Sequence, residues 1–236
     1  MEMYTYNYFI NDSEKVLLDD LFVDETNKQI ITRLIREHRY FKELNEYGLP
    51  IDNKMLLNVS PGCGKTYTVK AIASGLDKNL IVLNLNNIIS GSINDITHNI
   101  KTVFNLAAKE KAVLFIDEFD EVSKVRSADI KDGDNISQLV NTMIHLIDYY
   151  PDNALLICAT DYSEFIEPSL LRCFDLSVTI RKPSPELLDD YYDNLLSRFP
   201  KNLRSIERMY SISFAQARDH ALAAIKTAMI DQIESR

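Results

Sequence analysis

Residues 58–71, NVSPGCGKTYTVKA, include the side-chain types that bind a nucleoside triphosphate. Two closely spaced glycines let backbone N–H groups approach phosphate oxygens, and a helix that begins here would direct its positive end at them. Lys65 would reach the β- and γ-phosphates, and the Thr66 hydroxyl would ligate Mg²⁺. The predicted nucleotide-binding residues are Ser60, Pro61, Gly62, Cys63, Gly64, Lys65, Thr66 and Tyr67. The alternative is a turn that is rich in glycine by chance, which the Lys-Thr pair behind a predicted strand disfavours.

The loop departs from the usual pattern at its first position, where Val59 stands in place of glycine. A β-branched residue can continue a strand, but it resists a positive φ. The phosphate contacts come from Gly62 onward, so we expect a slightly altered loop with reduced rather than abolished affinity.

A second candidate lies where the apolar run 113–116 ends in two adjacent acids, Asp117 and Glu118. Asp117 would hold Mg²⁺ through water, and Glu118 would polarise the attacking water as a general base. The alternative is a strand that leaves the core into a solvated acidic turn, since Asp120 and Glu121 follow. Its place one strand-helix unit beyond the phosphate loop favours the catalytic interpretation.

Short apolar runs alternate with helical patterns along the middle of the chain, which indicates a parallel sheet covered on both faces. We predict strands at residues 54–59, 80–85, 112–116, 154–159 and 176–180. We predict helices at residues 24–44, 65–74, 93–109 and 136–149. Residues 5–11 alternate aromatic and polar side chains, which suggests a short strand or an extended arm.

After residues 182–185, Lys-Pro-Ser-Pro, the pattern becomes helical at 186–198 and 213–234, and Ser213 with Gln216 resembles a capping box. We therefore expect three parts. They are an N-terminal arm and helix at 1–45, a nucleotide-binding core at 46–182, and a helical lid at 183–236.

The composition, 46% hydrophobic and 26% charged residues over 236 positions, is that of a soluble globular protein. The net charge of −9 argues against broad, non-specific binding of nucleic acid, which depends on basic residues. Three scattered cysteines suit a reducing compartment. The acidic, polar N-terminus is unlike a signal peptide, and no apolar run approaches the ~20 residues that span a bilayer. We expect a cytoplasmic protein without a membrane segment.

The motifs GCGKT, LFIDEFD, ICATDYSEF and EPSLLRCFD, in this order, resemble those of the AAA+ ATPases. The chain is similar in particular to small single-module members of the AAA clade, over roughly residue 19 to the C-terminus. The resemblance implies an α/β fold, a P-loop NTPase αβα sandwich with a five-stranded parallel sheet and a C-terminal helical lid. It also implies ATP and Mg²⁺ as cofactors, a homo-oligomeric and usually hexameric ring, and a protein substrate that is pulled or remodelled.

Carrying the family's roles onto this chain reveals further departures. After Ala159-Thr160 the family usually places an asparagine that senses the γ-phosphate, whereas this chain has Asp161. An ionised aspartate accepts hydrogen bonds but cannot donate one, so Asp161 could orient water only through its oxygens. The alternative is an acid on a surface loop after the strand.

The family's finger arginine, which completes the neighbouring subunit's site, corresponds to Cys173 when the alignment is anchored on Phe174-Asp175. Only Arg172 could substitute, and the alternative is a plain surface arginine.

The pore-loop aromatic is also missing, since residues 92–94 read Ser-Ile-Asn; a short polar loop is the favoured interpretation there. Residues 21–23 could form an apolar wall beside adenine or an ordinary core contact. Arg218, near the lid position Ala215, is assigned no role.

The leading hypothesis is an ATPase that assembles into a ring and remodels a protein partner, with Glu118, Asp161 and Arg172 as catalytic residues and Thr66 and Asp117 at the metal. The alternative is a nucleotide-dependent switch or scaffold with weak turnover, because the finger arginine and the pore aromatic are missing. A DNA-dependent ATPase of the helicase-loader type is disfavoured by the net acidity. No residue of the N-terminal region identifies the substrate.

Overall fold

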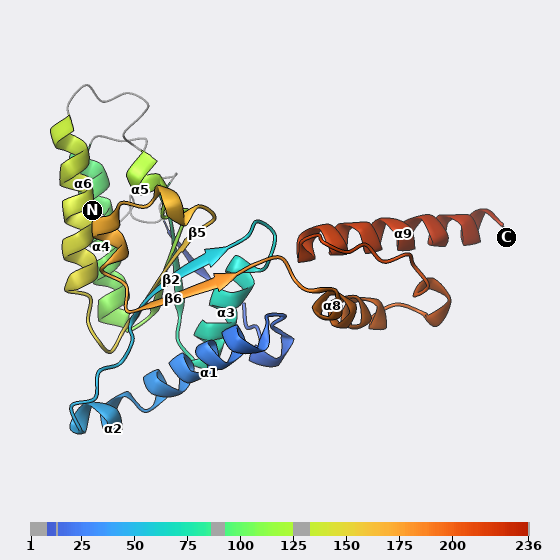
Figure 1. Cartoon of the computed structure of the whole chain (residues 1–236), viewed down its shortest axis with the longest axis horizontal. Helices are drawn as coiled ribbons and strands as arrows, with labels where there is room; N and C mark the ends of the chain where they lie inside the picture. The colour runs from blue at the N-terminus through green and yellow to red at the C-terminus, as the bar shows by residue number, and fades with distance from the viewer. Residues whose placement is uncertain (1–8, 13, 86–92, 125–132, 236) are drawn as a thin grey trace.

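The protein is described by a computed structural model that covers residues 9–12, 14–85, 93–124 and 133–235. Its centre is one six-stranded sheet with the strand order β1-β3-β4-β5-β2-β6 (Figure 1). The strands are β1 (Phe9–Asp12), β2 (Lys54–Val59), β3 (Leu80–Asn84), β4 (Val113–Asp117), β5 (Leu155–Thr160) and β6 (Leu176–Ile180).

Strands β2 to β6 run parallel to one another, which confirms the predicted five-stranded parallel sheet. Strand β1 adds a sixth strand, antiparallel to β3 at the edge of the sheet. The sequence indicated a strand or an arm here and did not place it in the sheet; the earlier residues 5–8 lie outside the described part.

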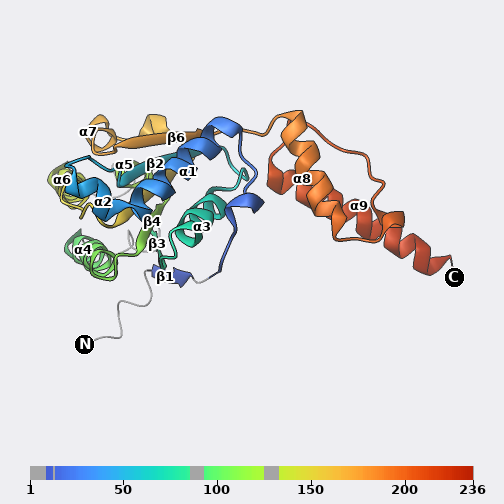
Figure 2. The same ribbon diagram turned by 90° about the horizontal axis from the view of Figure 1, so that it is seen from below.

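The parallel strands are apolar on both sides because each face carries a helical layer. Along β4, Leu114 and Ile116 pack into one buried cluster with α4 and α6, while Val113 and Phe115 pack into another with α1 and α3. Figures 1 and 2 show these two helix pairs on opposite faces of the sheet. The covering helices are α1 (Glu25–Arg39), α3 (Lys65–Gly75), α4 (Ile93–Glu110) and α6 (Gly133–Asp148).

The single helix predicted at residues 24–44 is wrong in one respect, because the chain breaks at Tyr40 into α1 and α2 (Phe41–Glu46). Asp24 caps α1 by accepting the Asn27 N–H at 2.9 Å. The buried stripe of α1 ends at His38, and none of the six described residues of α2 is buried. Beyond Tyr40 no core contact holds the chain on the axis of α1.

The C-terminal helices α8 (Pro185–Ser197) and α9 (Phe214–Glu234) pack on each other beyond the end of β6 (Figure 2). They share a buried cluster of their own, which includes Leu188, Tyr192 and Ala217. The predicted capping box is confirmed, since Ser213 and Gln216 bond reciprocally at the start of α9. This helical pair has a core separate from the two clusters that cover the sheet.

The sheet topology brings three loops together at the carboxyl ends of the parallel strands, here called the carboxyl edge; the opposite ends form the amino edge. Strand β5 lies between β4 and β2, and the three run parallel, so their carboxyl ends are neighbours. The phosphate loop follows β2, Asp117 ends β4, and Asp161 follows β5. The remaining short elements are η2 (Leu18–Asp20), α5 (Glu121–Lys124), η5 (Ser163–Phe165), α7 (Pro168–Leu171) and η6 (Lys201–Leu203).

Candidate functional site: a cavity beside charged strand ends

The phosphate loop turns sharply from β2 into α3. Gly62 and Gly64 have φ of +74° and +97°, in the left-handed region that favours glycine. The Cys63 N–H donates to the Ser60 carbonyl at 3.1 Å, and the Thr68 N–H donates to the Gly64 carbonyl at 2.8 Å, which begins α3. The turn thus directs the N-terminus of α3 toward the space beyond the sheet, as anion binding requires.

Val59 does not disturb this geometry. It is fully buried, continues β2 by one residue and pairs in register with Ile180 of β6. The next residue, Ser60, donates its N–H to the Ile180 carbonyl at 2.9 Å, so the strand continues to the start of the turn. The positive φ angles begin only at Gly62, and Val59 needs none.

Lys65, the first residue of α3, reaches across the end of β5. Its Nζ lies 2.9 Å from Oδ1 of Asp117 and 2.9 Å from Oδ1 of Asp161. The three side chains are between 19% and 29% exposed. The structure therefore links three of the predicted site residues through one ammonium group.

Burial by itself lowers the pKa of Lys65, but its hydrogen bonds to Asp161 and Asp117 outweigh burial and raise the pKa above its usual value. Burial also raises the pKa of Glu118, and the charge of Asp117 raises it further. Lys65 acts on Glu118 in the opposite direction. Glu118 is thus electrostatically coupled to the Lys65–Asp117 pair.

The backbone at Glu118 is strained, with a φ of +56° that non-glycine residues seldom adopt. Two bonds hold it: the Glu118 N–H donates to Oδ1 of Asp117 at 2.9 Å, and the Phe119 N–H donates to the Ala159 carbonyl at 2.8 Å. Strain of this kind persists where surrounding structure enforces it, which is common at functional sites.

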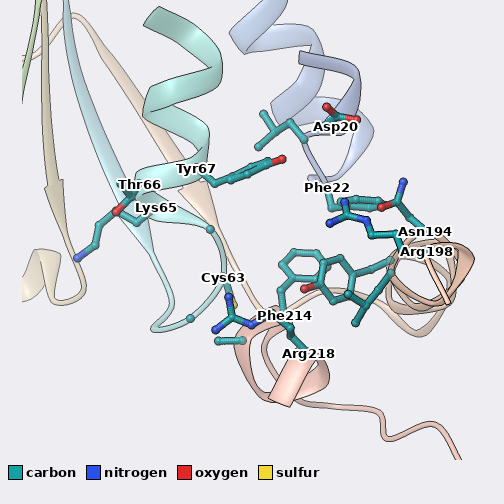
Figure 3. A pocket seen from close by; sticks show the side chains of 16 residues that line it. Asp20, Phe22, Cys63, Lys65, Thr66, Tyr67, Asn194, Arg198, Phe214 and Arg218 are labelled. Carbon is teal, nitrogen blue, oxygen red and sulfur yellow. The ribbon is translucent and has the colours of Figure 1, made fainter. Parts of the chain in front are cut away.

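A cavity of about 490 Å³ opens between the phosphate loop, the segment before α1, and helices α8 and α9 (Figure 3). Its lining is mainly apolar and aromatic, with a few charged groups, as is usual for a small-molecule site. The lining residues are Asp20, Leu21, Phe22, Gly62, Cys63, Gly64, Lys65, Thr66, Tyr67, Tyr191, Asn194, Leu195, Arg198, Phe214, Ala215 and Arg218.

Three aromatic rings from distant parts of the sequence meet at this cavity. Phe22 makes an edge contact with Tyr191 at a centroid distance of 5.3 Å, and Tyr191 lies 4.9 Å from Phe214. Residues 21 and 22 therefore line the cavity as the sequence suggested, whereas Val23 is buried and is not among the residues described as its lining. The rings offer an apolar surface on which a purine base could stack.

The helical pair contacts the phosphate loop directly. The Ala215 N–H donates to the Gly62 carbonyl at 3.1 Å, and a Cβ on Gly62 would lie only 2.7 Å from the Ser213 hydroxyl. In Figure 3 the Arg218 guanidinium points from α9 toward the loop near Cys63, and Arg198 projects from α8 into the cavity. Both arginines thus face the cavity from the side opposite the sheet.

The comparisons with known proteins agree with this architecture. The family model described as "ATPase family associated with various cellular activities (AAA)" matches residues 55–182, more than half of the 236-residue chain. The chain belongs to this AAA ATPase family. The match spans the phosphate loop, the acidic pair at the end of β4 and the stretch up to the end of β6.

Individual relatives of this AAA chain are distant in sequence. It is 27% identical over 217 residues to an uncharacterized AAA family ATPase, y4kL, of Sinorhizobium fredii (strain NBRC 101917 / NGR234), a match that covers 91% of this chain and 66% of the relative. It is 28% identical over 176 residues to the ATP-dependent zinc metalloprotease FtsH of Mycoplasma mobile (strain ATCC 43663 / 163K / NCTC 11711), covering 72% of this chain and 25% of that protein.

Among solved structures, the FIGL-1 AAA domain is similar in fold, with a TM-score of 0.74 at 18% identity. The alignment covers 97% of this chain and 79% of that domain. In the part of this chain that the structure describes, no helix is both long and apolar enough to cross a membrane.

The residues predicted to bind nucleotide divide into two groups in this AAA fold. Residues 62–67 line the cavity, whereas Ser60 and Pro61 are absent from its described lining. Ser60 instead uses its backbone to close the turn. Asp117, Glu118 and Asp161 also lie outside the described lining, but Lys65 connects two of them to it.

The structure does not bring Arg172 to the other predicted catalytic residues. It is exposed at the end of α7, before β6 begins, whereas the phosphate loop lies beside the carboxyl end of β6. The five residues of β6 separate the two positions by about 16 Å at the usual rise per strand residue. Within one AAA chain Arg172 therefore lies near the amino ends of the strands, away from the phosphate loop; Figure 2 shows α7, which it directly follows, at the end of β6 far from α8.

Cys173, at the position of the family's finger arginine, faces inward. It is 9% exposed, and its Sγ lies 3.5 Å from the Ser169 carbonyl. Burial, and then the neighbouring Asp148, raise the pKa of Cys173 to about 11. The pore-loop expectation cannot be compared with the structure, since Ser92 and the side chain of Ile93 lie outside the described residues.

The donor set at the strand edge fits a magnesium ion shared with a nucleotide. The described residues include no group of three or more His, Cys, Asp or Glu side chains that could hold a metal alone. Mg²⁺ is usually bound by one or two protein oxygens together with phosphates and water. Thr66, exposed in the cavity, and Asp117, at the end of β4, are oxygen donors of that kind.

Proposed function

We propose that this AAA ATPase binds Mg-ATP in the cavity, with the base against Phe22, Tyr191 and Phe214 and the phosphates along residues 62–66. The observation that carries the proposal is Lys65, which extends from the loop and is held between the acids that end two neighbouring strands. A cation in this position has phosphate oxygens as its natural partners once a nucleotide enters.

We assign hydrolysis to Glu118 as the base that polarises water, with Thr66 and Asp117 holding Mg²⁺. The bound ion would supply charge neutralisation for the phosphates. The raised pKa of Glu118 suits a group that must accept a proton. Lys65 would exchange carboxylate for phosphate oxygens, and Arg218 would approach the phosphates from α9.

We propose that the chain works as a homo-oligomeric ring in the cytoplasm and remodels a protein partner. Arg172 is exposed far from the phosphate loop of its own chain, so a finger role for it would require the site of another copy, as a ring provides. Residues 183–236 would move as a lid with the nucleotide, through the bond between Ala215 and Gly62. Three buried cysteines without a disulfide fit a reducing compartment.

A second candidate, a nucleotide-dependent switch with weak turnover, is favoured by the surroundings of Cys173. Its side chain packs in the core beside α6, so no exposed cation stands at the family's finger position. Arg172 is then the remaining candidate finger, one residue away. If it cannot reach the neighbouring site, ATP would bind and hydrolyse slowly.

The proposal is tested with Glu118→Gln, which keeps the shape of the side chain and removes the base. We expect Mg-ATP to increase the mass of this variant in light scattering to a multiple of the subunit mass. Its turnover should be about 10²-fold or more below that of the wild-type protein. Glu110→Gln, an exposed acid at the end of α4 just before β4, is the matched control. If the wild-type protein hydrolyses ATP but Mg-ATP does not change the mass of Glu118→Gln, the ring is excluded. If the mass changes but the wild-type protein does not hydrolyse ATP, the switch is favoured.

A further inference from the structure

Asp161 holds Lys65 as closely as Asp117 does, although the two acids belong to different strands. We propose that Asp161 is a specificity-determining residue, which makes the site accept nucleotide as its divalent-cation complex and disfavour the free polyanion. The inference rests on the proposed function and concerns the form of the ligand that enters the site.

The first argument is competition for Lys65. Strand β5 lies between β4 and β2, so a residue directly after β5 stands between the phosphate loop and Asp117. The ammonium group has three donors, and two carboxylates already engage it at 2.9 Å each. Phosphate oxygens must displace Asp161 before Lys65 can bind them fully.

The second argument is charge balance. Three carboxylates, of Asp117, Glu118 and Asp161, are coupled to the single ammonium group of Lys65. Once Lys65 turns to phosphate, Asp161 is left facing a polyanion in a part-buried region where screening is weak. A divalent cation between carboxylate and phosphate removes that repulsion, because it cancels part of the charge on both.

The third argument is that the backbone at Asp161 cannot easily move away from the loop. The preceding Thr160 is fully buried and donates its hydroxyl to Asp120 at 2.7 Å, and the same hydroxyl accepts the Tyr162 N–H at 2.9 Å. One residue further, the Asn58 amide donates to the Ser163 hydroxyl at 3.0 Å. The backbone is therefore anchored on both sides of the carboxylate, at a fixed distance from the loop.

The test compares the affinity for a non-hydrolysable β,γ-imido analogue of ATP, with Mg²⁺ and with EDTA, by titration calorimetry. Three proteins are measured: wild type, Asp161→Asn, and the control Glu164→Gln, an exposed acid three residues away. Asparagine keeps the shape and one acceptor oxygen and removes the charge. We expect EDTA to weaken wild-type binding about 100-fold, and Asp161→Asn to reduce that factor by about tenfold. Glu164→Gln should behave as wild type.

The inference is overturned if Asp161→Asn leaves the ratio of the two affinities within twofold of wild type, or if Glu164→Gln changes it equally. In those cases the nucleotide still binds and the proposed function stands. Absence of binding in wild type under both conditions would instead overturn the proposed function, and this inference with it. Melting curves confirm that the variants are folded at the titration temperature.

Discussion

The charged residues at the two edges of the parallel sheet differ in what they contact. At the carboxyl edge, Lys65 pairs with Asp117 and Asp161 beside an open cavity. Glu118, directly after Asp117, has a backbone φ in the left-handed region. At the amino edge the charges serve the fold. Oδ2 of Asp175 accepts the N–H groups of two consecutive residues, 53 and 54, at 3.1 Å each and ties β2 to the start of β6.

The difference separates a sheet edge that could bind a ligand from one whose charges stabilise the fold. The carboxyl edge gathers cations, acids and a cavity within one chain, because three parallel strands end together there. At the amino edge Arg172 is exposed, while the nearby Asp175 carboxylate bonds to the backbone at the start of β2. If the function is as proposed, the first edge binds and the second completes a neighbour's site.

The largest expected effect comes from comparing two lysines that lie at opposite ends of β2, Lys65 in the phosphate loop region and Lys54 at the start of the strand. Lys65→Ala removes the cation between Asp117 and Asp161, so we expect ATP affinity to fall about 100-fold and turnover to be lost. Lys54→Ala, whose partner is Asp175 at 3.7 Å on the amino edge, should leave the affinity unchanged. Calorimetric titration of both variants with Mg-ATP measures this contrast. Equal losses in the two would contradict a division of labour between the edges.

The next effect concerns catalysis between copies. Arg172→Ala should retain ATP affinity and lose about 10³-fold in turnover if Arg172 completes a neighbour's site. Mixing it with Lys65→Ala should then restore part of the activity, because each variant supplies the edge that the other lacks. The steady-state rate of the mixture, against each protein alone, is the measurement. A mixture no faster than its components would place no catalytic group on the amino edge.

The smallest effect is on stability alone. Asp175→Asn weakens a carboxylate that accepts two backbone N–H groups, so we expect a loss of about 1–2 kcal/mol in the free energy of unfolding. For a chain of this size that lowers Tm by a few degrees. Thermal melting followed by circular dichroism checks this value, and titration with Mg-ATP should show an unchanged affinity. A change in affinity larger than in stability would connect the two edges energetically.

Much of the core could be predicted from local pattern. Strands β2 and β6 have the predicted bounds, and β3, β4 and β5 differ by one residue at their ends, because apolar runs bounded by polar residues mark buried strands. The break at Tyr40 was missed, since periodicity at residues 24–44 continues past the point where burial stops.

For the site, the sequence predicted the phosphate loop and the acidic pair but not the aromatic residue Tyr191 of the cavity. The phosphate loop and the acidic pair have spacings set by chemistry, so their residue types are visible in order along the chain. Tyr191 and Tyr192 are adjacent in sequence, yet Tyr192 is fully buried in the helical core while Tyr191 lines the cavity. Helical spacing places them on different faces, but it does not say which face meets the phosphate loop.

The sequence by itself determined the family, the parallel sheet and the residues that could bind a triphosphate, because these follow from motif spacing and burial patterns. Only the tertiary structure decided that Asp161 pairs with Lys65, that Cys173 is buried and that Arg172 lies at the opposite edge. Those facts depend on strand order, and strand order arises from packing between distant segments, such as β2 and β6, whose paired residues Met55 and Leu176 are 121 positions apart (176 − 55).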